Sequence, residues 1–135
     1  MKKSSIFTPL TVLILGDVFT FAITTGIGFA FHETLGSASL RFLATFLPIL
    51  AGWLLVAPAL GVFDRDHSRN FRQLWRPVWA TFLAAPLAAW LRGLWLVSVI
   101  SPIFVLVLGG INMLAILIWR SLYIMAASRM MIKHG

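Results

Sequence analysis

Two charged side chains lie deep inside long apolar stretches of this 135-residue chain, and they are the residues best placed to do chemistry. Asp17 stands in the first stretch and Arg92 in the third. Ionisable groups at membrane depth are costly, so they usually pair with each other or mark an ion or substrate pathway. Asp17 could therefore accept a proton or a cation, with Arg92 as an anion site or counter-charge. Equally, the two could form an internal ion pair that only fixes the register of two helices.

Other polar residues fall on the same helix faces as these charges. Thr20, Thr24 and Gly28 follow at helical spacing and extend one polar stripe. Asn112 lies in the fourth stretch, at a depth between Asp17 and Arg92 when a helical rise of about 1.5 Å per residue is counted. Glu33 is an alternative partner for Arg92, and the sequence leaves that choice open. The predicted intramembrane polar cluster comprises Asp17, Arg92, Asn112, Thr20 and Thr24.

The elements that must position these residues are membrane helices. Sixty per cent of the residues are hydrophobic, 11% are charged and the mean hydropathy is +0.95, which is outside the range of water-soluble domains. A membrane-spanning helix needs about 20 mostly apolar residues. We therefore expect an all-α polytopic membrane protein, with residues 1–135 forming a single four-helix transmembrane domain. The expected spans are Pro9–Phe31, Phe42–Phe63, Pro77–Val99 and Pro102–Tyr123.

The distribution of Lys and Arg predicts the orientation of these spans. Cytoplasmic loops of membrane proteins are enriched in Lys and Arg. Of the basic residues outside the predicted membrane interior, only Arg41 falls on one side. The other side carries Lys2, Lys3, Arg65, Arg69, Arg72, Arg76, Arg120, Arg129 and Lys133. Both termini are therefore expected to be cytoplasmic, in a multi-pass protein of a prokaryotic plasma (inner) membrane.

Four arginines are regularly spaced between the second and third stretches. They are four, three and four residues apart and would share one face of a helix. This pattern predicts a short interfacial helix whose arginines face anionic lipid head groups, each adding about 1 kcal/mol of attraction, or an acidic partner. The alternative is an irregular loop in which they only set the topology. The predicted surface comprises Arg65, Arg69, Arg72 and Arg76.

The composition argues against several classes of chemistry. The chain has no cysteine, so disulfides, thiolate metal sites and cysteine nucleophiles are excluded. His32 is predicted on the outer side, and His67 and His134 on the inner side, so they cannot share a metal. We therefore expect no catalytic residues, no metal and no cofactor. The net charge of +7 fits anionic lipid better than nucleic acid in so apolar a chain.

Several short motifs carry a resemblance to a known family. They are Gly16-Asp17, the run from Gly52 to Pro58 with Leu60-Gly61, Pro86 with Trp90-Leu91-Arg92, and Trp119-Arg120. With these motifs the chain resembles an uncharacterised prokaryotic four-helix integral membrane family, a domain of unknown function found in actinobacteria, chloroflexi and haloarchaea. The resemblance implies a membrane protein with no assigned activity.

Small multidrug exporters and polyprenyl-lipid flippase-like proteins share only size and topology with this chain. The exporters carry a glutamate where Asp17 stands and have no counterpart of Arg92, so the likeness does not carry their function.

Two functions follow as hypotheses. The first is a non-enzymatic accessory or assembly component of a membrane complex, which would contact other membrane subunits or a second copy. Its contacts would use the arginine surface and the small-residue ladder of Thr81, Ala85, Ala89 and Gly93, since small residues let membrane helices approach closely. The alternative is a proton- or ion-coupled small-solute transporter or channel, working as a homo-oligomer through Asp17 and Arg92.

Overall fold

The computed structural model describes residues 9–31, 38–97 and 99–134, with side chains for 10–28, 41–97 and 99–129. All regular structure in this part of the chain is helical. The elements are α1 (Pro9–Phe31), α2 (Ala38–Ala59), α3 (Arg65–Ser68), the 3-10 helix η2 (Phe71–Gln73), α4 (Trp75–Leu96) and α5 (Pro102–His134).

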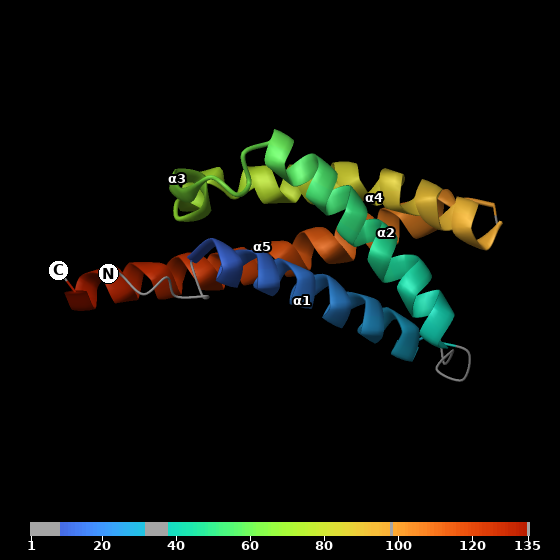
Figure 1. Ribbon diagram of the computed structural model, residues 1–135, viewed down its shortest axis with the longest axis horizontal. Coiled ribbons are helices and arrows are strands. Elements are labelled where there is room, and N and C mark those ends of the chain that lie inside the picture. The colour runs from blue at the N-terminus through green and yellow to red at the C-terminus, as the bar shows by residue number, and fades with distance from the viewer. Residues whose placement is uncertain (1–8, 32–37, 98, 135) are drawn as a thin grey trace, which may run out of the picture.

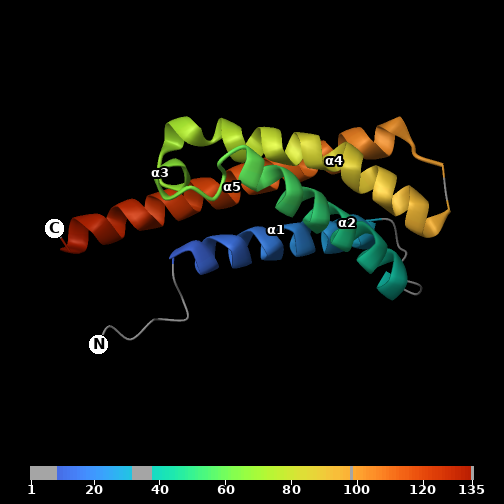
Figure 2. The same ribbon diagram turned by 45° about the horizontal axis from the view of Figure 1, so that its top comes forward.

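The helices α1, α4 and α5 run roughly along the long axis of the molecule, and α2 crosses them obliquely (Figure 1). The most extensive packing is between α2 and α4 and between α4 and α5, while α1 lies against α5 and α2. Figure 2 shows the C-terminal part of α5 extending beyond the beginning of α1. The 33 residues of α5 correspond to about 50 Å of helix, more than the hydrocarbon core of a bilayer requires.

Small residues set the close approach of the central helices. A Cβ atom at Gly52 would lie 3.0 Å from the Ala84 carbonyl oxygen, and one at Gly109 would lie 3.2 Å from the Ala85 Cβ. These positions bring α2 and α5 against the two sides of α4. The ladder residues Thr81, Ala85 and Ala89 are buried within the chain itself. The ladder therefore packs the bundle internally, and only its last member, Gly93, is partly exposed.

The helix boundaries match the predicted spans to different degrees. The predicted first span coincides with α1, which begins at Pro9, where the missing N–H of proline costs nothing. The predicted second and third spans are each displaced toward the C-terminus relative to α2 and α4. The predicted fourth span ends at Tyr123, whereas α5 continues to His134. That last difference decides the ion pairing described below.

Three helices of the described chain are long and apolar enough to cross a membrane by length and composition. These spans are Leu10–Gly28, Arg41–Ala59 and Pro102–Arg129. The third expected span, which falls in α4, does not meet the same criterion. The helix α4 holds Arg76 and Arg92 together with several tryptophans and alanines, which contribute less hydropathy than leucine or isoleucine.

The expected interfacial helix between the second and third spans is not continuous. α3 has four residues, and Asn70 beyond it has extended backbone (φ −120°, ψ 121°). The Asn70 side chain accepts a hydrogen bond of 3.0 Å from the Arg72 N–H and begins η2. This asparagine cap interrupts the helix, so the prediction of four arginines on one helical face was wrong.

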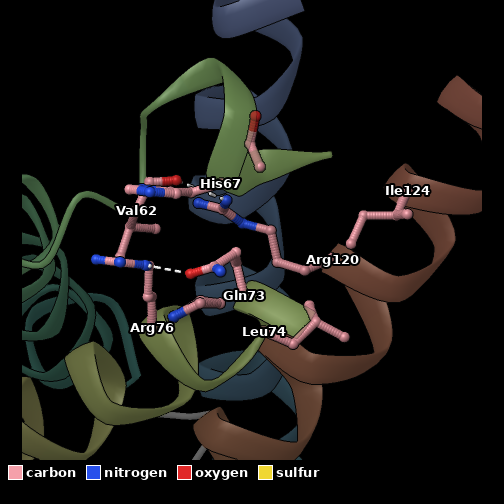
Figure 3. Close-up of a pocket in the computed structure, with 9 residues that line it drawn as sticks. Val62, His67, Gln73, Leu74, Arg76, Arg120 and Ile124 are labelled. Atoms are coloured by element: carbon pink, nitrogen blue, oxygen red, sulfur yellow. Dashed lines mark hydrogen bonds between the residues drawn. The ribbon is translucent and has the colours of Figure 1, made fainter. Parts of the chain in front are cut away.

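Arg76 instead folds back onto the bundle. Its Nε donates to Gln73 Oε1 at 2.7 Å, as Figure 3 shows, and its Nη1 donates to the Leu60 carbonyl at 2.7 Å. Arg65 and Arg72 are exposed and Arg69 is partly exposed. Two of the four predicted arginines are therefore exposed at this end of the bundle, and Arg69 is partly exposed with its Nε buried.

Candidate functional site

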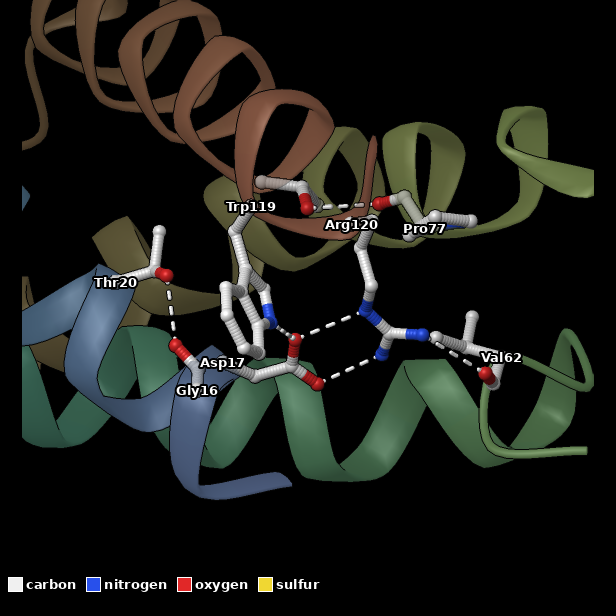
Figure 4. A network of polar contacts seen from close by, with 8 residues as sticks. Gly16, Asp17, Thr20, Val62, Pro77, Trp119 and Arg120 are labelled. Carbon is white, nitrogen blue, oxygen red and sulfur yellow. Dashed lines mark hydrogen bonds and ion pairs between the residues drawn. The ribbon is translucent and has the colours of Figure 1, made fainter. Parts of the chain in front are cut away.

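The Asp17 carboxylate pairs with Arg120 of α5. Arg120 Nε donates to Asp17 Oδ1 at 2.9 Å, and Arg120 Nη2 donates to Asp17 Oδ2 at 2.7 Å (Figure 4). The two side chains are 0% and 2% exposed. This is the bidentate geometry in which a planar guanidinium matches a carboxylate, and it is the strongest class of protein ion pair. It fixes α1 against α5.

Further groups complete this ion pair. Trp119 Nε1 donates to Asp17 Oδ1 at 3.0 Å, and Arg120 Nη1 donates to the Val62 carbonyl at 3.1 Å. The Arg120 guanidinium also lies 5.7 Å and 5.8 Å from the ring centres of Trp53 and Phe63. Both carboxylate oxygens are therefore bonded, and the guanidinium also ties α5 to the turn after α2. We call Asp17, Trp119, Arg120 and the Val62 carbonyl the ionic lock.

Gly16 makes room for the ionic lock. A Cβ atom at this position would overlap the indole ring of Trp119, which lies beside the Gly16 backbone in Figure 4. Thr20, one turn further on, donates its hydroxyl to the Gly16 carbonyl at 2.7 Å. The motifs Gly16-Asp17 and Trp119-Arg120 thus fit together as one unit: the glycine admits the indole, and the neighbouring residues form the ion pair.

The prediction that Arg92 is the partner of Asp17 was wrong. The cause is the length of α5. With a helix end at Tyr123, Arg120 falls close to the membrane boundary, where basic residues usually set topology. Because α5 continues to His134, Arg120 lies about 21 Å from the C-terminal end of the helix by the helical rise, and not in its last turn. The C-terminal part of α5 extends beyond the beginning of α1 (Figure 2), and Arg120 lies against Asp17. The alternative partner of Arg92, Glu33, lies outside the described residues.

Arg92 belongs to a second polar centre. Its Nε donates to Thr45 Oγ1 of α2 at 3.1 Å, and its guanidinium lies 4.7 Å from the ring centre of Phe104 on α5. The positive charge of Arg41 is close enough to repel that of Arg92. Arg92 is partly buried and Arg41 is exposed. This centre gathers residues from the end of α4, the beginning of α2 and the beginning of α5.

The remaining predicted polar residues divide between the two centres. Thr20 lies beside the ionic lock, as described. Thr24 Oγ1 donates to Asn112 Oδ1 at 2.6 Å, and Asn112 Nδ2 donates to the Leu108 carbonyl at 2.8 Å. Asn112 was predicted to bridge Asp17 and Arg92, but both ends of its amide are engaged elsewhere. Thr24 and Asn112 therefore tie α1 to α5 on the Arg92 side of the bundle.

A cavity of about 300 Å³ joins this second centre. We call it the Arg92 cavity. Its polar side is formed by Arg41, Thr45, Arg92, Thr24 and Asn112, and its apolar side includes Phe104, Val107 and Ile111. The volume is at the lower end of the range for small-molecule sites, about 300–1,000 Å³. Sequence analysis placed Arg92 and Asn112 in a site but did not find Thr45, Arg41 or Phe104 as their neighbours.

Comparison with known families covers both centres. A family model described as "Protein of unknown function (DUF3054)" matches residues 14–123. The chain belongs to the DUF3054 family. The matched segment contains Asp17, Arg92 and Arg120, and it agrees with the resemblance drawn from the motifs. No curated protein and no solved structure matches the chain significantly.

Two further hollows of this DUF3054 protein lie at the other end of the bundle. One, of about 10 Å³, lies beside Arg120, His67 and Gln73 (Figure 3) and has room for about one water molecule. The other measures about 320 Å³ and is lined by Arg65, Arg69, Ser68, Tyr123, Phe63, Leu10 and Leu13. Arginines thus border apolar side chains next to the ionic lock. The described residues contain no cluster of three or more His, Asp or Glu side chains that could hold a metal.

Proposed function

We propose that this protein is a multi-pass protein of a prokaryotic plasma membrane, with four spans and both termini cytoplasmic. The three apolar helices support the membrane assignment, and the surface of α4 supports a fourth span. The large exposed residues of α4 are all apolar, including Trp79, Leu83, Trp90 and Leu94. Its 22 residues correspond to about 33 Å, enough to cross the hydrocarbon core. Arg92 borders the Arg92 cavity, which has other polar side chains along one side, rather than an unbroken lipid-facing surface.

Within that membrane, the protein acts as a non-enzymatic accessory or assembly component. One observation carries this proposal: Asp17 is the only described carboxylate within the apolar helices, and both its oxygens are held by Arg120. A coupling carboxylate must bind and release its ion during each cycle. A carboxylate in a closed bidentate pair with a third donor from Trp119 serves the architecture instead.

The partners of this role are anionic lipid and other membrane subunits or a second copy. Arg65 and Arg72 are exposed and Arg69 is partly exposed at the end of the bundle assigned to the cytoplasmic leaflet, where an arginine at the surface adds about 1 kcal/mol of attraction to anionic lipid. Gly26 and Gly110 leave open space where a Cβ atom would stand. A partner helix can approach such glycines closely.

Proton flux into vesicles separates this role from Asp17-coupled transport. The purified protein is reconstituted into vesicles that contain a pH-sensitive dye, and a pH gradient is imposed. We expect no more flux than in protein-free vesicles. Asp64→Asn is the matched control, because Asp64 is 70% exposed in the α2–α4 connection. Flux that Asp17→Asn abolishes and Asp64→Asn preserves would overturn the proposal.

Cross-linking in native membranes tests the assembly role directly. A photoreactive residue at position 110, in the open space of α5, should give a discrete adduct with another membrane polypeptide or with a second copy. The same residue in place of Leu55, an exposed position on α2, is the control and should give only diffuse lipid adducts. Identical diffuse products at both positions would contradict a partner at this face.

A further inference from the structure

The Arg92 cavity is a built site that the assembly role does not use. It collects two arginines, Arg41 and Arg92, and no carboxylate is among its described lining residues. Both charges come from separate helices and point to one hollow between four helices. The ionic lock, in contrast, neutralises its own arginine completely. Two like charges at one cavity repel each other, and a bound anion would relieve that repulsion.

The described neighbours of Arg92 orient its charge and carry no negative charge themselves. The Thr45 hydroxyl accepts from Nε, and the Phe104 ring presents its negative face to the guanidinium. An arginine has five N–H donors in a fixed fork. Only the Nε donor of Arg92 is taken up by the described residues. Among the described residues the other four have no acceptor, and a fork of parallel N–H groups matches the two oxygens of a phosphate or carboxylate.

The rest of the cavity wall indicates what kind of molecule the phosphate or carboxylate group belongs to. Phe104, Val107 and Ile111 form an apolar side opposite the arginines and threonines. The polar side is held in place, since Thr24 and Asn112 bond each other at 2.6 Å. A ligand with a negatively charged group and a hydrocarbon segment would fit this wall. The charged group would contact the arginines, and the hydrocarbon would contact the apolar side chains of α5. The volume of about 300 Å³ accommodates a head group or a small solute.

We propose that the Arg92 cavity binds an oxyanion, a phosphate or carboxylate group, held by Arg92 and Arg41. An adjoining hydrocarbon segment packs against Phe104, Val107 and Ile111. The oxyanion belongs either to an anionic lipid or to a free solute, and the two sources differ in whether the hydrocarbon contact is required. This inference is independent of the assembly role, because it concerns the opposite end of the bundle from the arginines Arg65 and Arg69.

Binding of defined probes to the purified full-length protein tests the proposal. The probes are dihexanoyl phosphatidylglycerol, dihexanoyl phosphatidylcholine as the zwitterionic reference, and inorganic phosphate. The background carries Arg65→Gln and Arg69→Gln, so that lipid bound at the other end does not contribute. We expect Arg92→Gln to weaken phosphatidylglycerol binding about tenfold to a hundredfold, which corresponds to losing charged hydrogen bonds to the probe. Arg129→Gln is the matched control, since Arg129 is exposed on α5 away from the cavity.

The remaining outcomes assign the source or reject the site. Phosphatidylglycerol binding without phosphate binding identifies a lipid head group, and Arg92-dependent binding of phosphate alone identifies a free oxyanion. If each probe binds the Arg92→Gln variant as tightly as it binds the parent protein, the proposal is overturned. If Arg92→Gln does not give a monodisperse protein, Thr45→Val removes the oxygen that orients Arg92 and should weaken binding severalfold. Unchanged binding in that variant overturns the proposal in the same way.

Discussion

Removing the negative charge of Asp17 should strongly destabilise the protein, because it leaves the buried Arg120 without its partner. Asp17→Asn keeps the shape of the side chain but removes its negative charge. Arg120 is then left with a full charge at 2% exposure, and its remaining partners are the Val62 carbonyl and two aromatic ring faces. Leaving one member of a buried ion pair without its partner costs about 3–5 kcal/mol.

The geometry places the expected loss near the lower end of that range. The asparagine Oδ1 can still accept hydrogen bonds from Trp119 Nε1 and Arg120 Nε, now as a neutral acceptor, so only the Arg120 Nη2 donor loses its acceptor outright. A hydrogen bond to a charged group contributes about 1.5–3 kcal/mol, and the substitution weakens two of them. We therefore expect a loss of about 3 kcal/mol in the free energy of unfolding.

Reversible unfolding in mixed micelles measures this loss. The helical signal is followed as the fraction of denaturing detergent is raised, and the midpoint and slope give the free energy of unfolding. Asp64→Asn is the control and should change that free energy by less than about 0.5 kcal/mol, because Asp64 is 70% exposed. A value for Asp17→Asn as small as that of the control would refute the reasoning that the ionic lock holds α1 to α5.

Three further predictions follow from the structure. Gly16→Ala should cost about 1–3 kcal/mol, because its Cβ overlaps the Trp119 ring, whereas Gly26→Ala, in open space, should be neutral in the same unfolding assay. Trp119→Phe should cost about 1–3 kcal/mol by removing the indole donor to Asp17, and an unchanged stability would deny that bond any role. Reporter domains should be cytoplasmic at the C-terminus and external when inserted between α4 and α5; the same side for both would contradict a four-span topology.

Sequence patterns predicted the long helices well because proline and apolar length act locally. Pro9 and Pro102 begin α1 and α5 where expected, and the long apolar runs form helices. The Asn70 cap was a local signal as well, since asparagine favours helix beginnings, and it accounts for the broken helix among the arginines. The regular spacing of four arginines outweighed it in the prediction and gave one helix where there are two short ones.

The pairing of charges could not be obtained from depth counts alone. Depth depends on where each helix ends, and α5 continues well past the predicted end at Tyr123. A sequence signal for the pair was nonetheless present. Each of the two charges directly follows the residue of its motif that contacts the other helix, Gly16 before Asp17 and Trp119 before Arg120. The Arg92 cavity is lined by residues of four different helices, so it depends on how those helices pack together. The pattern of any one helix does not predict it. Its residues Thr45 and Phe104 carry no sequence mark of their own.

The coupling energy between Asp17 and Arg120 tests the central claim most directly. Two double-mutant cycles are measured by the same unfolding method, one combining Asp17→Asn with Arg120→Gln and the other combining it with Arg92→Gln. We expect the first cycle to give a coupling of about 1–3 kcal/mol and the second to be additive within about 0.5 kcal/mol. Additivity in the first cycle together with strong coupling in the second would contradict the separation of the two polar centres.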